Sequence, residues 1–391
     1  MYEHALIDFN STKIKSQALF YQINQNLFGN NYFRICNLNT FLITLYSMEV
    51  CMNNPTLTNK KFKGEPCIEL NAGRYTALIA PRIGANILRL CDNENKIELV
   101  NYSYKVPMKF LRWPSLVHGM PSLLYPNRIA KGVFTTSHTT YNLPINTKWE
   151  DNYLHGFVHT RKYTVESVDI NNDERSATVT CKYIYDEKDE FYTNFPLAFT
   201  SYITYTLSPE GLHYSMEIVN NSDKPLPVGL GNHTGFKAPF TRKTKKDNLR
   251  ISFPATKRVE IIDNLCTGNF LELSEYDNGY VDGSMQPVLH EVDNEMYLLG
   301  KMDTAAKKDF HGIVISDTLT GYQIYNEYSE EYPFVNLWNC GGTHDFFCVE
   351  PMSWLIDAPN IKMPSDITGY REIAPGESFS AWQKLFSHST K

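Results

Sequence analysis

From about residue 60 onward, hydrophobic and polar positions alternate with a period of two. In the segment 212–219 every second residue is apolar, and the segment 177–185 shows the same alternation. Successive side chains of a β-strand point to opposite faces, so this pattern places the apolar residues on one buried face. Both segments are rich in aromatic and β-branched residues, which suit a half-buried pleated surface. The pattern therefore predicts strands.

Turn signals separate the predicted strands. The sequence Ser208-Pro-Glu-Gly211 is typical of a hairpin loop, Asn220–Asp223 ends the next strand, and Asp317–Gly321 separates two later ones. Long helical periodicity is hard to find, and residues 60–391 contain no linker of low complexity and no repeat. We expect an all-β protein, a large antiparallel β-sandwich or barrel, with residues 53–391 forming a single domain.

The stretch 1–52 differs from the rest of the chain. It is rich in asparagine, and its apolar patch, 40–46, is too short to cross a membrane. No basic segment opens it and no small-residue cleavage site follows the patch. We interpret 1–52 as an N-terminal extension. One hypothesis is that the native chain starts at Met48 or Met52, which measurement of the native mass would test.

Composition and charge limit the classes of binding partner that we expect. The chain has 391 residues and a net charge of -6, and its densest basic run, 242–246, is short. Nucleic acid is therefore not an expected partner, and neither is a membrane. The eight cysteines form no Cys-x-x-Cys pair and follow no zinc spacing. We interpret them as reduced thiols of a cytoplasmic protein.

Three residues stand out as chemical candidates. Glu350 ends the apolar run Phe-Phe-Cys-Val-Glu and is followed by Pro351. Partial burial would make this carboxylate a better base near neutrality, whereas a solvated acid at a strand end is the plainer alternative. His155 lies in Leu-His-Gly-Phe, where a hydrogen-bonded core histidine is the commoner reading. His155 and His159 are four residues apart, but this segment reads as extended, so we expect no metal site there.

The run Gly229-Leu-Gly-Asn-His-Thr-Gly235 surrounds the third candidate, His233. It is not a dinucleotide-binding loop, because the third glycine falls one position late and no helical pattern follows. We expect the glycines to let the backbone pass close to a ligand, with His233 exposed at a strand end.

Arg128, in Tyr-Pro-Asn-Arg-Ile, could aim a fixed fork of donors at ligand hydroxyls, although a surface arginine paired with an acid is the plainer reading. Tryptophans 113, 338 and 354 flank these motifs. An indole can stack on the apolar face of a pyranose or can fill a core, which is the commoner use.

Together and in this order, the motifs resemble the aldose 1-epimerase (galactose mutarotase) family over roughly residues 65–387. The matching pieces are Pro126-Asn-Arg-Ile, Leu154-His-Gly-Phe, Gly229-Leu-Gly-Asn-His233 and Val349-Glu-Pro. The resemblance implies a galactose-mutarotase-type sandwich with an open cleft and no cofactor. It implies that Glu350 takes the proton of the anomeric hydroxyl, that His233 protonates the ring oxygen, and that His155 supports them.

The resemblance also implies a set of residues that bind the monosaccharide. By position these are Arg128 with the adjoining Asn127, Trp338, and an aspartate that precedes an aromatic strand. Asp293 is the best match for the aspartate and Glu295 is the alternative, since the spacing to the aromatic residue is one longer than expected.

The resulting hypothesis is a cytoplasmic enzyme that interconverts the α and β anomers of a free hexose. Anomerisation of a hexose 6-phosphate is a close alternative, which requires cations near the phosphate, for example from Lys131, Arg161 or Lys237. A non-catalytic carbohydrate-binding protein on the same fold is the alternative from another class. The sequence carries no signal for an oligomeric state.

Overall fold

The computed structural model of the protein describes residues 54–112 and 116–391. The predicted N-terminal extension, 1–52, and Trp113 lie outside the described residues. Within the described part of the chain, no helix is long and apolar enough to span a membrane.

Three larger sheets build the fold, and neighbouring strands in them run antiparallel. An eight-stranded sheet, which we call the back sheet, has the order β11-β12-β13-β14-β27-β23-β22-β18. Its strands are β11 (Thr164–Asn171), β12 (Ser176–Tyr185), β13 (Phe199–Ser208), β14 (Gly211–Asn220), β27 (Ser378–Ser389), β23 (Tyr322–Tyr328), β22 (Gly312–Asp317) and β18 (Leu249–Ser252).

A second eight-stranded sheet, which we call the site sheet, has the order β20-β19-β21-β24-β25-β16-β6, with β17 also paired to β25. Its strands are β20 (Leu265–Leu271), β19 (Ala255–Ile262), β21 (Asp293–Leu299), β24 (Phe334–Trp338), β25 (Phe346–Met352), β16 (Gly231–Asn232), β6 (Ser122–Leu123) and β17 (Thr234–Lys237).

The remaining strands form a five-stranded sheet, β1 to β5, and three short pairs. The five-stranded sheet contains β1 (Thr56–Phe62), β2 (Glu65–Ala72), β3 (Tyr75–Ala80), β4 (Asn86–Asp92) and β5 (Ile97–Glu98). The pairs are β7 (Arg128–Ala130) with β10 (Asn152–Leu154), β8 (Val133–Thr135) with β9 (Thr140–Asn142), and β15 (Leu226–Pro227) with β26 (Glu372–Ile373).

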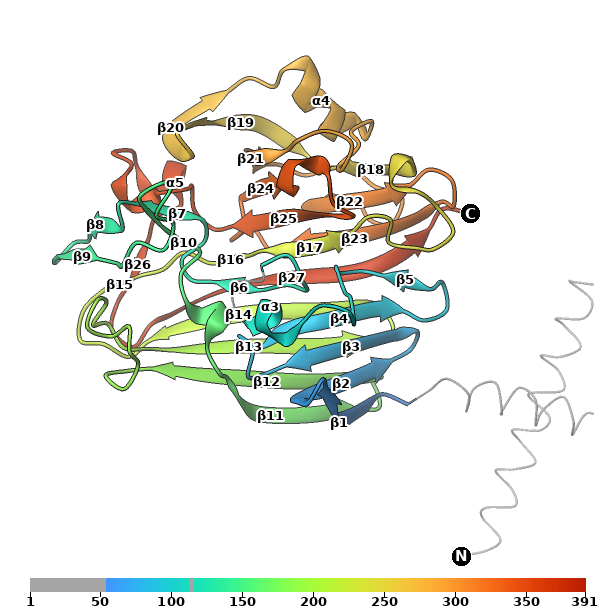
Figure 1. The fold of residues 1–391 in the computed structure, drawn as a ribbon, viewed down its shortest axis with the longest axis horizontal. Coiled ribbons are helices and arrows are strands. Elements are labelled where there is room, and N and C mark those ends of the chain that lie inside the picture. Colours follow the sequence, from blue (N-terminus) through green and yellow to red (C-terminus); the bar gives the residue numbers. More distant parts are fainter. Residues whose placement is uncertain (1–53, 113–115) are drawn as a thin grey trace, which may run out of the picture. The chain divides into compact units, whose positions relative to one another are not determined.

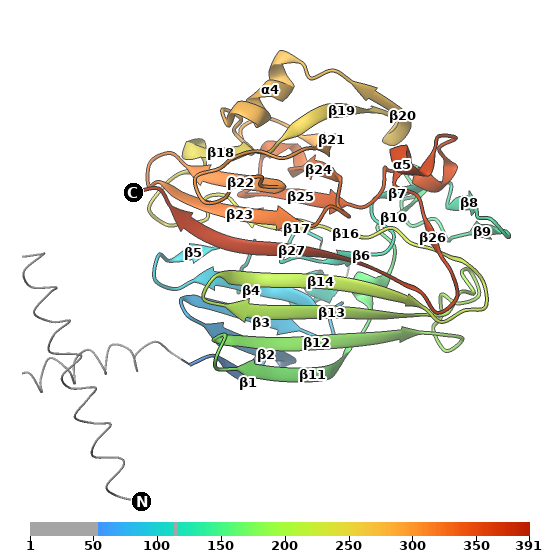
Figure 2. The same cartoon turned by 180° about the vertical axis from the view of Figure 1, so that it is seen from behind.

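Two layers of sheet face each other. In Figure 1 the site sheet and the five-stranded sheet lie one above the other toward the viewer, and Figure 2 shows the back sheet covering both from behind. Antiparallel sheets packed in this way make a β-sandwich. The large antiparallel β-sandwich predicted from the sequence is therefore confirmed.

The period-two pattern of the sequence generates the core between the layers. On β14 the alternating residues Leu212, Tyr214, Met216 and Ile218 are fully buried, and the apolar positions of β12 are buried in the same way. The hairpin between β13 and β14 turns through the two residues Pro209 and Glu210, as the sequence predicted. Gly211 has a φ of +122° there, a conformation that L side chains rarely adopt.

Helices are short and lie in connections. They are α3 (Met108–Arg112), α4 (Glu275–Asp282), α5 (Ser365–Thr368) and the 3-10 turns η1 (Val158–Thr160), η2 (Lys246–Asn248), η3 (Cys340–Gly342) and η4 (Ala358–Asn360). The α4 helix begins at a capping box, in which the Ser274 side chain accepts from the backbone N–H of Asp277. It ends at Gly283 with a φ of +75°.

Candidate active site

A cleft of about 970 Å³ is lined by residues from β7, β10, β21, β24, β25 and α3 and by residues of the adjoining loops. All seven site residues predicted from the sequence line it: Asn127, Arg128, His155, His233, Asp293, Trp338 and Glu350. They come from segments that lie far apart along the chain, and the sandwich brings them together.

Glu350 and His233 form the centre of the cleft. Glu350 lies on β25 and is only 2% exposed, so the solvated acid considered from the sequence is not observed. The Nε2 atom of His233 lies 3.3 Å from Oε1 of Glu350. Strand pairing fixes this geometry. The strands that flank His233 in the sequence, β16 before it and β17 after it, both pair with β25, which carries Glu350.

His233 departs from the prediction in its burial. We expected it to be exposed at a strand end, but it is 4% exposed between β16 and β17. Both flanking strands belong to the site sheet, and Trp338 covers the imidazole edge-on at a ring-centroid distance of 6.0 Å. The histidine is therefore a buried group at the floor of the cleft.

The glycines around His233 make room for neighbouring segments of the protein. A Cβ atom on Gly229 would lie 2.3 Å from the Trp354 ring, one on Gly231 would lie 2.7 Å from Pro126, and one on Gly235 would lie 2.2 Å from the Val117 carbonyl oxygen. The expectation that they let the backbone pass close to a ligand stays a prediction. They let three neighbouring segments of protein close against the His233 strand.

His155 follows β10 in a turn rather than in the predicted extended segment. Its φ is +63° and that of Gly156 is +64°, and η1 begins at Val158. The backbone N–H of His155 donates to the carbonyl oxygen of Asn127 at 2.8 Å. This turn brings both His155 and His159 to the cleft, which an extended segment would not do.

Burial sets the charge state of these two histidines. The pKa of His155 lies well below the ordinary value of 6.5, mainly because burial penalises the imidazolium and then because His233, His159 and Arg128 are close. Burial, followed by the proximity of His233 and Arg161, lowers the pKa of His159 to about 4. Both imidazoles are therefore neutral near pH 7. The His155 ring packs edge-on against His233, with ring centroids 5.1 Å apart.

Unsatisfied polar atoms concentrate at this centre. Among the described residues, Nδ1 of His155, Nδ1 of His233, Oε2 of Glu350 and Oδ1 of Asn336 are buried without a hydrogen-bond partner. Asn336, on β24, also donates through Nδ2 to Oε1 of Glu350 at 3.2 Å. Buried polar atoms are normally paired, so such a cluster at the floor of a cleft indicates a site for a polar ligand.

Arg128 is held by an acid inside the cleft. Its Nε and Nη2 atoms donate to the Glu150 carboxylate at 2.6 and 2.9 Å, and Nη1 donates to Oδ1 of Asn127 at 3.0 Å. The alternative considered from the sequence, an arginine paired with an acid, is thus correct about the pairing. The pair lines the cleft instead of lying on the outer surface. The guanidinium of Arg128 lowers the pKa of Glu150.

A β-bulge decides between Asp293 and Glu295. The pairing of β21 with β24 shifts register between these two residues, and Asn294 between them has a φ of +58°. A bulge adds one residue to a strand and changes the face of the residues that follow. It accommodates the extra residue noted in the sequence. As a result, Asp293 and Asn294 line the cleft.

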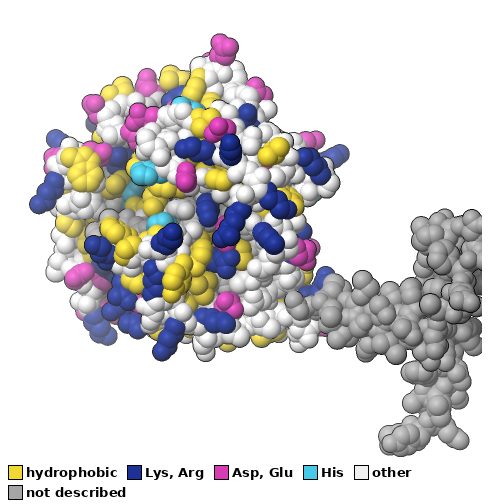
Figure 3. Space-filling model, turned by 45° about the vertical axis from the view of Figure 1, so that its right-hand side comes forward, with side chains coloured by type: hydrophobic (Ala, Val, Ile, Leu, Met, Phe, Trp, Pro, Cys, Tyr) yellow, Lys and Arg dark blue, Asp and Glu magenta, His cyan; other side chains and the backbone are white. Residues whose placement is uncertain are grey.

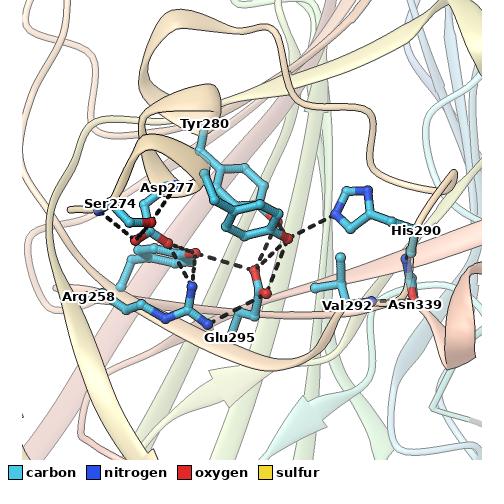
Figure 4. Close-up of polar contacts among 10 residues, drawn as sticks. Arg258, Ser274, Asp277, Tyr280, His290, Val292, Glu295 and Asn339 are labelled. Carbon is cyan, nitrogen blue, oxygen red and sulfur yellow. Dashed lines mark hydrogen bonds and ion pairs between the residues drawn. The ribbon is translucent and has the colours of Figure 1, made fainter.

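Glu295 is used elsewhere. Its carboxylate accepts from Tyr276 at 3.2 Å and from Tyr280 at 3.0 Å, and Nη2 of Arg258 lies 3.5 Å away. Figure 4 shows this carboxylate pointing toward Arg258 and Tyr280. These contacts tie the α4 segment to β19 and β21. Of the two acids considered from the sequence, Asp293 therefore lines the cleft and Glu295 does not.

The tryptophans divide between the two uses considered. Trp338 lines the cleft beside His233, where its indole is available to a ligand. Trp354 is fully buried and stacks on Tyr125 at a ring-centroid distance of 4.9 Å, so it fills the core.

The same three central residues are also the groups that could hold a metal ion. The nearest donor atoms of His155, His233 and Glu350 lie within 4.8 Å of one another. Two imidazoles and a carboxylate are a common ligand set for zinc, at about 2.0–2.2 Å each. The sequence had considered only His155 with His159 and predicted no metal, which stays a prediction.

Sequence reasoning missed several residues of the cleft, including Asn336, Asn294, Trp149, Glu150 and His118, and it considered His159 only as a metal ligand. A signal for Asn336 was present, because it is two residues before Trp338 on the same strand and so shares its face. Glu150 carried no local signal, because its partner Arg128 lies 22 residues away.

Comparisons with known proteins agree with this geometry. The family model described as aldose 1-epimerase matches residues 66–385. Over 178 residues the chain is 24% identical to the uncharacterized protein YihR of Escherichia coli K12, a match that covers 45% of this chain and about half, 52%, of YihR.

Solved structures with the same fold include a galactose mutarotase-like protein from Clostridium acetobutylicum. It has a TM-score of 0.82 and 28% identity, with 86% of this chain and 99% of that chain covered. A galactose 1-epimerase from Lactobacillus acidophilus NCFM has a TM-score of 0.62 at 14% identity, covering 86% of this chain and 98% of that one. Because the family model spans most of the sandwich and all of the cleft residues, this chain belongs to the aldose 1-epimerase family.

Proposed function

We propose that this protein is an isomerase that interconverts the α and β anomers of an unphosphorylated hexose. The observation that carries the proposal is the contact between His233 and Glu350, 3.3 Å apart, buried and surrounded by unpaired polar atoms in a cleft. Ring opening needs one group that removes the anomeric proton and one that protonates the ring oxygen. Those two oxygens are bonded to the same carbon, so an acid and a base side by side can reach both.

The catalytic cycle begins with Glu350 ionised and His233 protonated. Glu350 takes the proton of the anomeric hydroxyl while His233 gives its proton to the ring oxygen, and the C1–O5 bond breaks to leave the open-chain aldehyde. Rotation about C1–C2 presents the other face of the carbonyl group. The two proton transfers then run in reverse and the ring recloses. General acid and base groups of this kind each contribute about 10²–10⁴ in rate.

The charge state of His155 supports this division of roles. Its pKa is held well below the ordinary histidine value, mainly by burial, so it stays neutral while His233 cycles. A neutral imidazole can donate one hydrogen bond to an oxygen on which charge develops without competing for the transferred proton. We therefore assign His155 a supporting role.

Hydroxyl recognition falls to the polar groups around this centre. In the proposal, Arg128, Asn127 and Asp293 bind sugar hydroxyls, and Trp338 packs against the apolar face of the ring. Asn127 and Arg128 are already held in place by hydrogen bonds without a bound sugar. Because these side chains are ordered beforehand, less conformational entropy is lost when the sugar binds.

The charge of the cleft favours a free sugar over a sugar phosphate. Of the described residues that line it, Arg128 is the one lysine or arginine, and Glu150 already engages it. Asp293 and Glu350 add two more acids. Lys131, Arg161 and Lys237, considered from the sequence, are not among the lining residues, and Arg161 is paired with Asp189. Phosphate recognition would require cations that this lining does not offer.

A cytosolic location completes the proposal. The six described cysteines, Cys67, Cys91, Cys181, Cys266, Cys340 and Cys348, are free thiols. Free thiols in this number suit a reducing compartment.

Polarimetry tests the proposal directly. Freshly dissolved α-glucose and α-galactose should reach their equilibrium rotation faster with the protein than without it, and Glu350→Gln or His233→Asn should remove most of that acceleration. Glu217→Gln, the same exchange on β14 of the back sheet, is the matched control and should retain full activity. A folded protein that binds hexoses but accelerates no aldose would instead be a carbohydrate-binding module.

A further inference from the structure

His118 lines the cleft, yet the proposed reaction gives it no role. It is half-buried in the loop between α3 and β6. The backbone N–H of His233 donates to the carbonyl oxygen of Pro121 at 2.9 Å, and that of Gly235 donates to the carbonyl oxygen of Gly119 at 3.0 Å. The loop that carries His118 therefore runs beside the segment that carries the proposed acid.

Two buried asparagines fix the position of His118. Nδ2 of Asn86, on β4, donates to the carbonyl oxygen of His118 at 3.0 Å, and its Oδ1 accepts from the backbone N–H of Met120 at 2.8 Å. Nδ2 of Asn101 donates to the carbonyl oxygen of Val117 at 2.7 Å and lies 3.3 Å from Nδ1 of His118. Both the backbone and the imidazole of His118 are thus held before any ligand binds.

The contact with Asn101 determines the tautomer of His118. A carbonyl oxygen can only accept, so the Val117 oxygen at 2.7 Å requires the amide NH₂ group of Asn101 on this side. Because that NH₂ group can only donate, Nδ1 of His118 is the acceptor and the imidazole proton lies on Nε2. Burial lowers the pKa of His118 below the ordinary value of 6.5, so the ring is neutral near pH 7.

The Nε2–H group of His118 is available to a ligand. Among the described residues no acceptor lies within hydrogen-bond distance of Nε2, and this atom is not shut off from solvent. On the face drawn in Figure 3, histidine side chains reach the surface among hydrophobic ones toward the left of the view. Since His118 lines the cleft, its unused donor is reached from the cleft.

The rest of the lining offers few unused donors. The guanidinium of Arg128 is largely engaged by Glu150 and Asn127. The side-chain amides of the lining already donate within the protein, from Asn127 to Asn294, from Asn146 to Leu154, from Asn294 to Asn264 and from Asn336 to Glu350. The ionised acids of the lining can only accept, whereas a sugar hydroxyl both donates and accepts. A hexose in this cleft therefore needs a donor such as the one on His118.

We propose that His118 binds the hexose directly, with its Nε2–H group donating a hydrogen bond to one hydroxyl oxygen of the sugar. Asn101 is the positioning residue that keeps the imidazole proton on Nε2. The inference rests on the proposed function for the identity of the ligand, a hexose. His118 takes no part in the proton transfers. It selects hexoses that carry a hydroxyl group within its reach.

Binding of deoxy sugars tests the contact without depending on catalysis, because anomerisation leaves an equilibrium mixture unchanged. Isothermal titration calorimetry compares glucose with glucose that lacks one hydroxyl group at a time. For one of these deoxy sugars, the wild type should lose roughly three- to tenfold more affinity than His118→Phe loses, the net value of one neutral hydrogen bond.

Two further variants sharpen this comparison. His118→Gln places an amide nitrogen near the position of Nε2 and should restore most of the difference. His388→Phe makes the same exchange at a half-buried histidine on β27 of the back sheet, and it should behave as the wild type. An unchanged Tm shows for each variant that the fold is intact.

NMR of the imidazole nitrogens tests the role of Asn101. In the wild type the spectrum should show His118 with its single proton on Nε2. Asn101→Asp replaces the donating amide by a carboxylate, which can only accept, so it should place a proton on Nδ1 of His118. A loss of stability alone would leave the tautomer unchanged.

Two results would overturn the inference. One is a series of deoxy sugars whose affinity losses are the same in the wild type and in His118→Phe. The other is a wild-type spectrum with the proton of His118 on Nδ1, a measurement that needs no variant. The failure of the proposed function has a different signature, in which glucose binding depends on His118 but no sugar shows accelerated mutarotation.

Discussion

Glu350 and His233 should act as one unit, and a double-mutant cycle measures whether they do. Gln at position 350 has nearly the shape of Glu and keeps an oxygen that can accept from Asn336, so the geometry survives while the proton acceptor is lost. Each single variant should lower kcat by about 10²–10⁴, equivalent to about 2.7–5.5 kcal/mol in the activation free energy. The two groups lie 3.3 Å apart and move protons in the same step.

Independent contributions would multiply to a loss of about 10⁴–10⁸ in the double variant, whereas a coupled pair should show little more than the larger single loss. The assay is polarimetry of α-galactose at high protein concentration, with the spontaneous rate subtracted and the Tm of each variant measured. Multiplicative losses would refute concerted transfer by this pair. A Glu350→Gln variant within tenfold of wild type would remove Glu350 from the mechanism.

Four further predictions follow from the site and its surroundings. Burial lowers the pKa of His159 in the folded protein to about 4 from 6.5. Between these two pH values the unfolded chain therefore binds a proton at this imidazole that the folded chain does not bind. The free energy of unfolding is therefore highest above about pH 6.5 and falls by about 3 kcal/mol toward pH 4 through this residue. In urea unfolding, the free energy of unfolding of His159→Asn should depend less on pH than that of the wild type. Gly156→Ala places a Cβ atom 1.9 Å from the Leu124 carbonyl oxygen, whereas one on Gly64 meets nothing within 4 Å. The first should therefore lower the free energy of unfolding by more than about 3 kcal/mol and the second by about 1 kcal/mol, and comparable losses in chemical denaturation would contradict the argument. Asp293→Asn should raise KM for the hexose at an unchanged Tm, while Glu295→Gln should lower the Tm; the reverse pattern in kinetics and calorimetry would exchange their roles. Mutarotation should survive dialysis against EDTA and be inhibited by added Zn²⁺ through the two histidines and the glutamate, and a loss of activity restored by metal would show that a cation is required.

The fold was predictable from sequence because the physical signal is local. Alternation over 212–219 and the turn at 208–211 depend on neighbours along the chain, and both predictions are confirmed. Placement of the seven predicted residues in one cleft was also anticipated, but through the resemblance of ordered motifs. No local property of Glu350 or His233 would have brought them together.

The missed features depend on contacts between distant segments. His233 was expected to be exposed at a strand end, yet it lies between β16 and β17 of the site sheet, with the rings of His155 and Trp338 packed edge-on against it. Period-two reasoning fails at Asn294, where a bulge changes which residues face the cleft. Glu150 could not be linked to Arg128 because ion pairing between distant residues leaves no pattern in the sequence.

The position of β27 in the back sheet bears on how the molecule is made. This strand, the last of the described chain, lies between β14 and β23 and pairs with both. During synthesis β14 and β23 therefore emerge with open edges, which stay available to other chains until residues 378–389 leave the ribosome. A nascent chain stopped before β27 would carry a divided sheet and two unpaired edges, so it would aggregate rather than fold into a shorter sandwich.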